Sequence, residues 1–219
     1  MSVLVSDLDH IVVVAAVLEE GVAFCEKTLG VKMIKGGEHA RVETHNYLLN
    51  LDESIYLEVI AINPAARTVD WPRWFGMDLP EARRRAEKGP YLATFVARTT
   101  DIVAAAKALP SLGPVRDMQR GDFQWQITIP DDGGMVEGGT VPTMIQWPAG
   151  VHPTWNMPLS GCRLERLEIA HPDTAHLRTL WSTIGLQPRR KLTIRDAEYD
   201  EAPRISAVFA TPNGMRTIC

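Results

Sequence analysis

Short apolar stretches alternate with helix-like stretches along this chain, and the same order recurs three times. The stretch Leu8–Val14 is largely apolar, and apolar side chains then recur every three or four residues from Val17 to Leu29. This pattern predicts a strand followed by a helix with one buried face. The order of strand and helix begins again at Tyr91 and at Arg163. The chain is therefore predicted to contain three similar units.

A glycine follows each predicted helix, and further strand-like segments follow each glycine. The glycines are Gly30, Gly113 and Gly185, and the three units close with the segments Tyr56–Ile60, Pro142–Trp147 and Met215–Cys219. Glycine suits the end of a helix because it adopts positive φ at little cost. We therefore predict an α+β fold of repeated βαβββ units, which must pair because one unit is too small to bury a face of its own sheet. Simple alternation of strands and helices is the alternative interpretation.

These units set the expected domain boundaries. Residues 1–62 form the first unit, 91–150 the second and 151–219 a third βαβββ-like unit, with residues 63–90 as a connector. The connector contains the segment Trp71–Gly76, with three aromatic rings in five residues. Such rings are usually core or interface anchors, and the wall of a pocket is their less common use.

Composition narrows the classes of protein to consider. The chain has 219 residues, 45% of them hydrophobic, and a net charge of −4. We therefore expect a soluble globular protein, with neither nucleic acid nor a membrane as a partner. No apolar run approaches the roughly 20 residues that span a bilayer, and the first residues lack the basic region of a signal peptide. The 3 cysteines are widely spaced, which fits reduced thiols in a cytoplasmic protein.

His10 and Glu58 are the most informative polar residues, because each interrupts a predicted apolar strand. An imidazole or a carboxylate buried without a partner is strongly unfavourable, so both side chains need partners. If their strands are neighbours, the two side chains can share a divalent metal ion or form a direct hydrogen bond. The residue pattern alone leaves both interpretations open.

The repeats test the metal interpretation. Aligning the glycines places Ala93 opposite His10 in the second unit, and aligning the closing strands places Gln146 opposite Glu58. Four protein ligands are therefore not visible. A site of His10, Glu58 and Gln146 would leave positions for water or substrate, which suits a catalytic metal but weakens binding.

A predicted strand of the first unit supplies further candidates. Thr44 and Asn46 share one face of this strand, so we expect them to line the same cavity as Glu58. His45 takes the other face and would be a ligand only if the register were shifted by one residue.

Several segments of the chain resemble the vicinal oxygen chelate superfamily, and within it the glyoxalase-like domain proteins. The resemblance rests on Leu8–Val12 and Tyr56–Val59, and on the segments Gly37–Asn46, Trp71–Gly76, Pro142–Trp147, His152-Pro153 and His171-Pro172. It implies that two units form a cupped mixed sheet around a cavity, with a third unit at the C-terminus. It also implies a divalent metal (Fe, Mn, Ni or Zn) on the inner face, bound by His10 and Glu58, that activates a small oxygenated substrate.

The resemblance is incomplete at the second unit, where Ala93 or Leu92 occupies the position of a second histidine and Gln146 that of a second glutamate. Our leading hypothesis is a metal-dependent lyase, isomerase or oxygenase, in which Gln146 is a third ligand or orients the substrate. Glu58 would act as the general base if no metal is present. Thr44 and Asn46 would bind the substrate, and the apolar walls would be Phe95, Trp125 and Trp147.

A metal-free binding protein, similar to the drug-sequestering members of the superfamily, is the alternative hypothesis. In such a protein the cavity would stack a planar ligand on tryptophan rings, of which the chain has 6. The third unit has no pairing partner in a two-unit cup, so we also expect a homodimer in which two such units cover each other.

Overall fold

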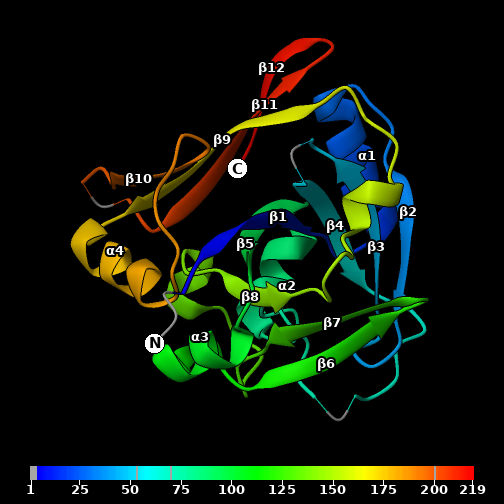
Figure 1. Cartoon of the computed structure of the whole chain (residues 1–219). Helices are drawn as coiled ribbons and strands as arrows, with labels where there is room; N and C mark the ends of the chain where they lie inside the picture. Colours follow the sequence, from blue (N-terminus) through cyan, green and yellow to red (C-terminus); the bar gives the residue numbers. More distant parts are fainter. Residues whose placement is uncertain (1–3, 53, 70, 200) are drawn as a thin grey trace.

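The computed structural model describes residues 4–219 except residues 53, 70 and 200, and Figure 1 shows how its elements are arranged. The first unit comprises β1 (Ser6–Val14), α1 (Leu18–Leu29), β2 (Ile34–His39), β3 (Thr44–Asn50) and β4 (Tyr56–Ile62). After α2 (Pro80–Glu87) in the connector, the second comprises β5 (Tyr91–Thr99), α3 (Ile102–Ala108), β6 (Val115–Arg120), β7 (Phe123–Thr128) and β8 (Thr143–Gln146). The C-terminal part comprises β9 (Arg163–His171), α4 (Thr174–Thr183), β10 (Leu192–Asp196), β11 (Arg204–Thr211) and β12 (Gly214–Ile218).

The first two units pair into one large sheet, as the repeat predicts. Its strand order is β2-β3-β4-β1-β5-β8-β7-β6. Within each unit the first strand runs parallel to the last, and the antiparallel pair of β1 and β5 joins the units. The sheet curves until its edges approach, where Arg41 Nη1 donates to the carbonyl oxygen of Asp117 at 3.2 Å. The predicted α+β fold with a cupped mixed sheet is confirmed.

The three aligned glycines all have positive φ. Gly30, Gly113 and Gly185 have φ of 73°, 78° and 73°, in the left-handed region that glycine adopts readily. Gly30 ends α1 as its C-cap, one residue after the last predicted helical position. Gly185 follows the C-cap of α4, whereas Gly113 follows a short 3-10 turn at Pro110–Leu112 that comes after α3, so the second glycine is not at the end of its α-helix.

The C-terminal unit departs from the order of the other two. Its sheet has the order β10-β9-β11-β12, and β9 runs parallel to the very next strand, β10. In the first two units, by contrast, the opening strand pairs with the closing one. The third unit is thus a βαβ crossover extended by a β11–β12 hairpin.

This C-terminal unit packs against the large sheet of its own chain. The ring of Trp181 in α4 lies 5.6 Å from that of Phe95 in β5, and Trp181 Nε1 donates to the carbonyl oxygen of Thr140 at 3.0 Å. Apolar residues of β9, α4 and β11 belong to the same hydrophobic cluster as those of α1 and α3. The face that we expected a second chain to cover is covered within the chain, which removes the reason for predicting a homodimer.

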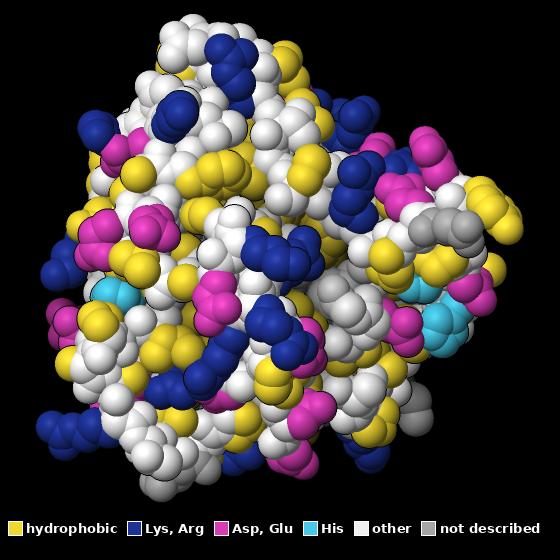
Figure 2. Space-filling view, turned by 180° about the vertical axis from the view of Figure 1, so that it is seen from behind, with side chains coloured by type: hydrophobic (Ala, Val, Ile, Leu, Met, Phe, Trp, Pro, Cys, Tyr) yellow, Lys and Arg dark blue, Asp and Glu magenta, His cyan; other side chains and the backbone are white. Residues whose placement is uncertain are grey.

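The surface carries mixed charge. On the face seen in Figure 2, basic and acidic side chains are interspersed with hydrophobic ones. Among the helices of the described residues, none has the length and apolar character needed to span a bilayer.

Candidate functional site

A small cavity lies inside the curved sheet, with a volume of about 20 Å³. Its walls come from β1, β2, β4, β6, β7, β8, the residue after β8 and the connector. The lining residues are His10, His39, Tyr56, Glu58, Trp74, Phe75, Arg120, Trp125, Ile127, Ile145 and Trp147. A volume of this size holds about one water molecule. The cavity is therefore a small space with a few polar side chains in a wall that is otherwise aromatic and aliphatic.

His10 is held on the cavity side of β1 by its neighbour in sequence. The pairing of β1 with β5 shifts register between Leu8 and His10, so that Asp9 is the extra residue of a β-bulge. Adjacent side chains of a regular strand point to opposite faces, but the bulge brings these two together. Asp9 Oδ1 lies 2.7 Å from His10 Nδ1. His10 is 3% exposed and Asp9 0% exposed, so the contact is shielded from solvent.

Glu58 faces the other nitrogen of the same ring. Glu58 Oε2 lies 3.6 Å from His10 Nε2. On its far side, Asn46 Nδ2 donates to Glu58 Oε1 at 2.5 Å, and Arg120 Nη1 donates to Asn46 Oδ1 at 3.2 Å. The carboxylate is thus fixed between a histidine and an amide, with an arginine behind the amide.

Asp9 connects the cavity to a second group of side chains. Its Oδ2 accepts a hydrogen bond from Trp147 Nε1 at 3.1 Å and lies 3.2 Å from His152 Nε2. Arg98 Nη1 lies 3.9 Å from the same oxygen. One buried carboxylate therefore contacts two histidines, a tryptophan and an arginine.

The charges of this network follow from its contacts. Burial alone would raise the pKa of Glu58, but the contact with His10 outweighs it and lowers that pKa to about 2. Burial would likewise raise the pKa of Asp9, yet His10 and His152 hold it below its usual value. Burial would lower the pKa of His10, whereas Asp9 and Glu58 together raise it. The resulting arrangement is an imidazolium between two carboxylates.

His39 and Tyr56 complete the polar wall as neutral groups. Burial lowers the pKa of His39 to about 4, so this imidazole is uncharged at neutral pH. Its Nδ1 lies 3.0 Å from Thr44 Oγ1. Burial also raises the pKa of Tyr56 well above its usual value, and its ring stacks on that of His10 with 4.4 Å between centroids. Both residues therefore present uncharged polar groups beside the charged pair.

The structure brings most of the predicted site residues together. His10, Glu58, Trp125 and Trp147 line the cavity directly. Asn46 and Thr44 are buried, but they contact Glu58 and His39 rather than the cavity. His45 occupies the opposite face of β3, as the strand alternation predicts.

Two predicted site residues lie elsewhere. Gln146 Oε1 accepts a hydrogen bond from the backbone N–H of Ile102, the first residue of α3, at 2.8 Å. Because Ile145 and Trp147 line the cavity, the residue between them faces the other side of the sheet. Phe95 is fully buried against Trp181, also on the helix side. The structure therefore places neither Gln146 nor Phe95 at the cavity.

The sequence reasoning assigned no role in the site to five residues: Asp9, His39, Tyr56, Arg120 and His152. Asp9 was visible as a carboxylate beside His10, but its role depends on a bulge that no local signal announces. Trp74 and Phe75 of the connector form part of the cavity wall, which is the less common of the two uses considered for such rings.

The donor atoms at the cavity do not fit a resident divalent metal. Among the described residues, no group of three His, Cys, Asp or Glu side chains is arranged to hold a metal ion. The side chains of His10, His39 and Glu58 line the cavity without such an arrangement, and Ile127 and Ile145 add apolar wall. Catalytic zinc sites usually have three protein ligands. The cation of Arg120, behind Asn46, would further oppose a second positive charge.

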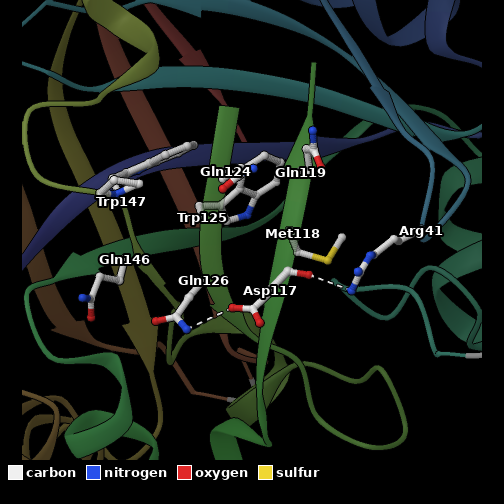
Figure 3. A pocket seen from close by; sticks show the side chains of 10 residues that line it. Arg41, Asp117, Met118, Gln119, Gln124, Trp125, Gln126, Gln146 and Trp147 are labelled. Carbon is white, nitrogen blue, oxygen red and sulfur yellow. Dashed lines mark hydrogen bonds between the residues drawn. The ribbon is translucent and has the colours of Figure 1, made fainter. Parts of the chain in front are cut away.

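A wider cleft of about 460 Å³ adjoins the cavity at its two tryptophans. Figure 3 shows Trp147 and Trp125 on neighbouring strands, with Gln126 Nε2 donating to Asp117 Oδ1 at 3.0 Å lower in the cleft. The two indole rings lie 5.4 Å apart. They form a shared wall between this cleft and the cavity.

Comparisons with known proteins identify the family. A family model described as a glyoxalase-like domain matches residues 8–185, whereas a search of curated proteins gives no match. A hypothetical protein from Staphylococcus aureus aligns with a TM-score of 0.57 and 16% identity, over 95% of this chain and 82% of that chain. A mutant of 4-hydroxymandelate synthase from Streptomyces coelicolor aligns with a TM-score of 0.54 and 13% identity, over 98% of this chain and 62% of the synthase.

At such identities the structural likeness concerns the fold alone. It agrees with the match of the family model, with the paired βαβββ units and with the cupped sheet. The chain belongs to the glyoxalase-like domain family of the vicinal oxygen chelate superfamily.

Proposed function

We propose that this protein is an enzyme that transfers protons to and from a small oxygenated organic molecule beside His10 and Glu58, in an isomerase or lyase reaction. The observation that carries the proposal is the position of His10, which is buried between the carboxylates of Asp9 and Glu58 at the cavity wall. A cationic acid next to an anionic base is the arrangement that general acid–base catalysis requires.

The two groups would act together on a carbonyl compound. His10 Nε2–H would donate to the carbonyl oxygen while the Glu58 carboxylate accepts the proton of the adjacent carbon, which gives an enol, neutral His10 and protonated Glu58. With a hydroxyl on the adjacent carbon, protonated Glu58 returns its proton to the former carbonyl carbon while that hydroxyl gives its proton to neutral His10, which completes an isomerisation and restores both groups. In an elimination the enol hydroxyl returns its proton to His10, and the group that departs from the next carbon takes the proton of Glu58. The positive charge of His10 keeps the pKa of Glu58 low, so the loss of that charge raises the basicity of Glu58.

The remaining residues would hold this pair in place. Asp9 orients the His10 ring through Nδ1, and Asn46 orients the Glu58 carboxylate through Oε1. The walls formed by Trp125, Ile127 and Ile145 exclude water, which strengthens both ionic contacts.

Deuterium exchange tests the proposal on any ligand that has a C–H bond next to a carbonyl group. A panel of small hydroxyketones and oxo acids is incubated with the protein in D₂O, and loss of the α-proton signal is followed by NMR. We expect exchange with wild type and a loss of about 100-fold or more in His10→Ala and Glu58→Gln. His45→Ala, on the opposite face of β3, is the matched control and should exchange at the wild-type rate. Equal exchange in all four proteins would contradict the assignment.

A metal-free binding protein is the second candidate, and the aromatic wall of Trp74, Trp125 and Trp147 favours it. The same panel separates the two functions. A compound that quenches tryptophan fluorescence on binding, but exchanges no proton, would support sequestration over catalysis.

A further inference from the structure

The cavity beside His10 is far smaller than the clefts outside it. Its volume of about 20 Å³ compares with about 330 Å³ for one adjoining cleft and 310 Å³ for the next. We call the first the aromatic cleft, which is lined among others by Arg98, Trp147, Val151, His152 and Trp155. We call the second the basic cleft, which is lined among others by Arg98, Arg189, Arg190, Lys191 and Leu192. A substrate larger than a water molecule must extend beyond the cavity.

The aromatic cleft adjoins the network around Asp9. Trp147 lines both this cleft and the cavity, and its Nε1 donates to Asp9 Oδ2 at 3.1 Å. His152, on the same cleft, lies 3.2 Å from that oxygen. Trp155 is 61% exposed, which is unusual for an indole ring and leaves it open to a ligand. This cleft therefore offers apolar surface one side chain away from His10.

The two clefts meet at Arg98. Asp7 and Arg98 line both of them. Arg98 Nη1 donates to the carbonyl oxygens of Leu8 and Ser54, both at 2.8 Å. In the part of the chain that the structure describes, the guanidinium forms its hydrogen bonds through this one nitrogen, which leaves the Nε and Nη2 donors for a ligand. The guanidinium of Arg98 is thus fixed in place where the two clefts meet.

The basic cleft has a marked excess of positive charge. Among the described residues that line it, Arg98, Arg189 and Arg190 carry guanidinium groups and Asp7 carries a carboxylate, while Lys191 has an interaction of its own. Asp7 Oδ1 lies 2.6 Å from Arg189 Nη1, so this carboxylate offsets the charge of that arginine. The excess is local, because the chain as a whole has a net charge of −4. A concave site with this balance favours an anion.

We propose that the aromatic and basic clefts form one binding channel, in which the basic cleft holds an acidic group, phosphate or carboxylate, at the far end of an elongated substrate. The apolar middle of the substrate lies on Trp155 and Trp147, and its reacting end reaches His10 when the Trp147 ring moves aside. The assignment of an elongated acidic substrate rests on the proposed function. The binding of an anion by the basic cleft does not depend on that function.

Calorimetric titration of the whole chain tests the anion site without any turnover. Inorganic pyrophosphate and malonate are the probes, one for each chemical source of the acidic group. We expect binding of at least one probe, and binding about tenfold weaker or more in Arg190→Gln. Asp7→Asn should bind more tightly, because it releases Arg189. Arg163→Gln, an exposed arginine of the same C-terminal unit, is the control and should match wild type.

Two results would overturn the channel. One is that neither probe binds wild type. The other is that Arg190→Gln and Asp7→Asn, folded by circular dichroism, bind as wild type does. A protein that binds the probe but exchanges no proton would keep the anion site and reject the proposed chemistry. For a substrate that is exchanged, Arg190→Gln should raise KM and leave kcat unchanged, since Arg190 is remote from the reacting atoms.

Discussion

Asp9 and His10 are consecutive in β1, yet their side chains meet on one face of the strand, with Asp9 Oδ1 2.7 Å from His10 Nδ1. In a regular strand the carboxylate would point into the opposite layer. The bulge places it beside the histidine instead, and Glu58 holds the other side of the ring. The protonation of His10 therefore depends on two carboxylates from different parts of the chain.

This dependence can be measured on His10 itself. Both carboxylates raise its pKa, so Glu58→Gln should lower that pKa, and Asp9→Asn should lower it too. NMR titration of the His10 ring protons gives the value in each variant. Asp7→Asn changes a half-buried carboxylate of the same strand, paired with Arg189, and serves as the control. An unchanged His10 pKa in Glu58→Gln would show that the two side chains are not coupled.

Acidification should lower the stability of the fold in a window set by His39. The pKa of His39 is about 4 in the fold, below its usual value of 6.5. The contribution of neutral His39 to the free energy of unfolding is therefore fully present above pH 6.5 and is lost as pH falls towards 4. The loss by about pH 4.5 should be on the order of 2 kcal/mol. Glu58, with a pKa lowered from 4.5 to about 2, contributes a loss only below this window. His10 has a raised pKa, so its stabilisation is complete below pH 6.5 and does not fall there.

Urea unfolding between pH 7 and pH 4.5 measures this effect. In His39→Phe the free energy of unfolding should change less over the window than in wild type. His176→Phe, at an exposed histidine, should leave the pH dependence unchanged. The interpretation fails if His39→Phe shows the same slope as wild type.

Metal content provides a separate test of the site. Because no three donors among the described residues are arranged to hold a metal ion, we expect metal well below one equivalent after incubation with Fe²⁺, Mn²⁺, Ni²⁺ or Zn²⁺ and removal of the excess. Elemental analysis of wild type beside His10→Ala and Glu58→Ala gives the answer. Near-stoichiometric metal in wild type that is absent from both variants would reinstate a metal centre.

Gln146 should matter for stability and not for chemistry. Its amide oxygen accepts the N–H of Ile102 at the start of α3, so Gln146→Ala leaves a helix-end donor without this partner. We expect a loss of roughly 0.5–2 kcal/mol in the free energy of unfolding and unchanged proton exchange. Gln126→Ala, on the same face of the sheet, should change neither quantity. Loss of exchange in a stable Gln146→Ala would return this residue to the site.

Trp181 should be the main contact that holds the C-terminal unit to the large sheet. Its ring is 0% exposed, and it contacts Phe95 and the carbonyl oxygen of Thr140. Trp181→Ala is expected to cost about 3–5 kcal/mol in thermal or denaturant unfolding. Tyr199→Ala removes a ring that is 97% exposed and should cost little. A small effect of Trp181→Ala would mean that the unit is attached by other contacts.

The fold was predictable because its signals are local and repeated. Apolar periodicity gave α1 to within one residue of its start, and Gly30 and Gly185 lie at the ends of α1 and α4. The order of the third sheet was not predictable in this way. The opening strand of a unit can run parallel to the strand after the helix, as β9 does, or to the closing strand of the unit, as β1 and β5 do. This choice depends on long-range packing, which the local pattern of apolar residues does not encode.

The sequence placed side chains on the correct face where strand alternation is regular, and not where it is interrupted. His10 and Glu58 stood out as polar residues in apolar strands, and the structure brings them together. Gln146 was assigned to the wrong face because a shift of one residue reverses every side chain of a strand. Arg120 and His152 reach the network from a hairpin and a loop, and no spacing in the sequence connects them to His10.

The cup is chemically one-sided. Its first unit contributes the charged pair of His10 and Glu58, and its second contributes the apolar wall of Trp125, Ile127 and Ile145, with Arg120 at its edge behind Asn46. The oxygen atoms of a bound ligand would lie against the first unit and its carbon skeleton against the second, so the ligand would bind in one orientation. Protons would then arrive at one face of a planar carbon, and the product of any such reaction should be a single enantiomer.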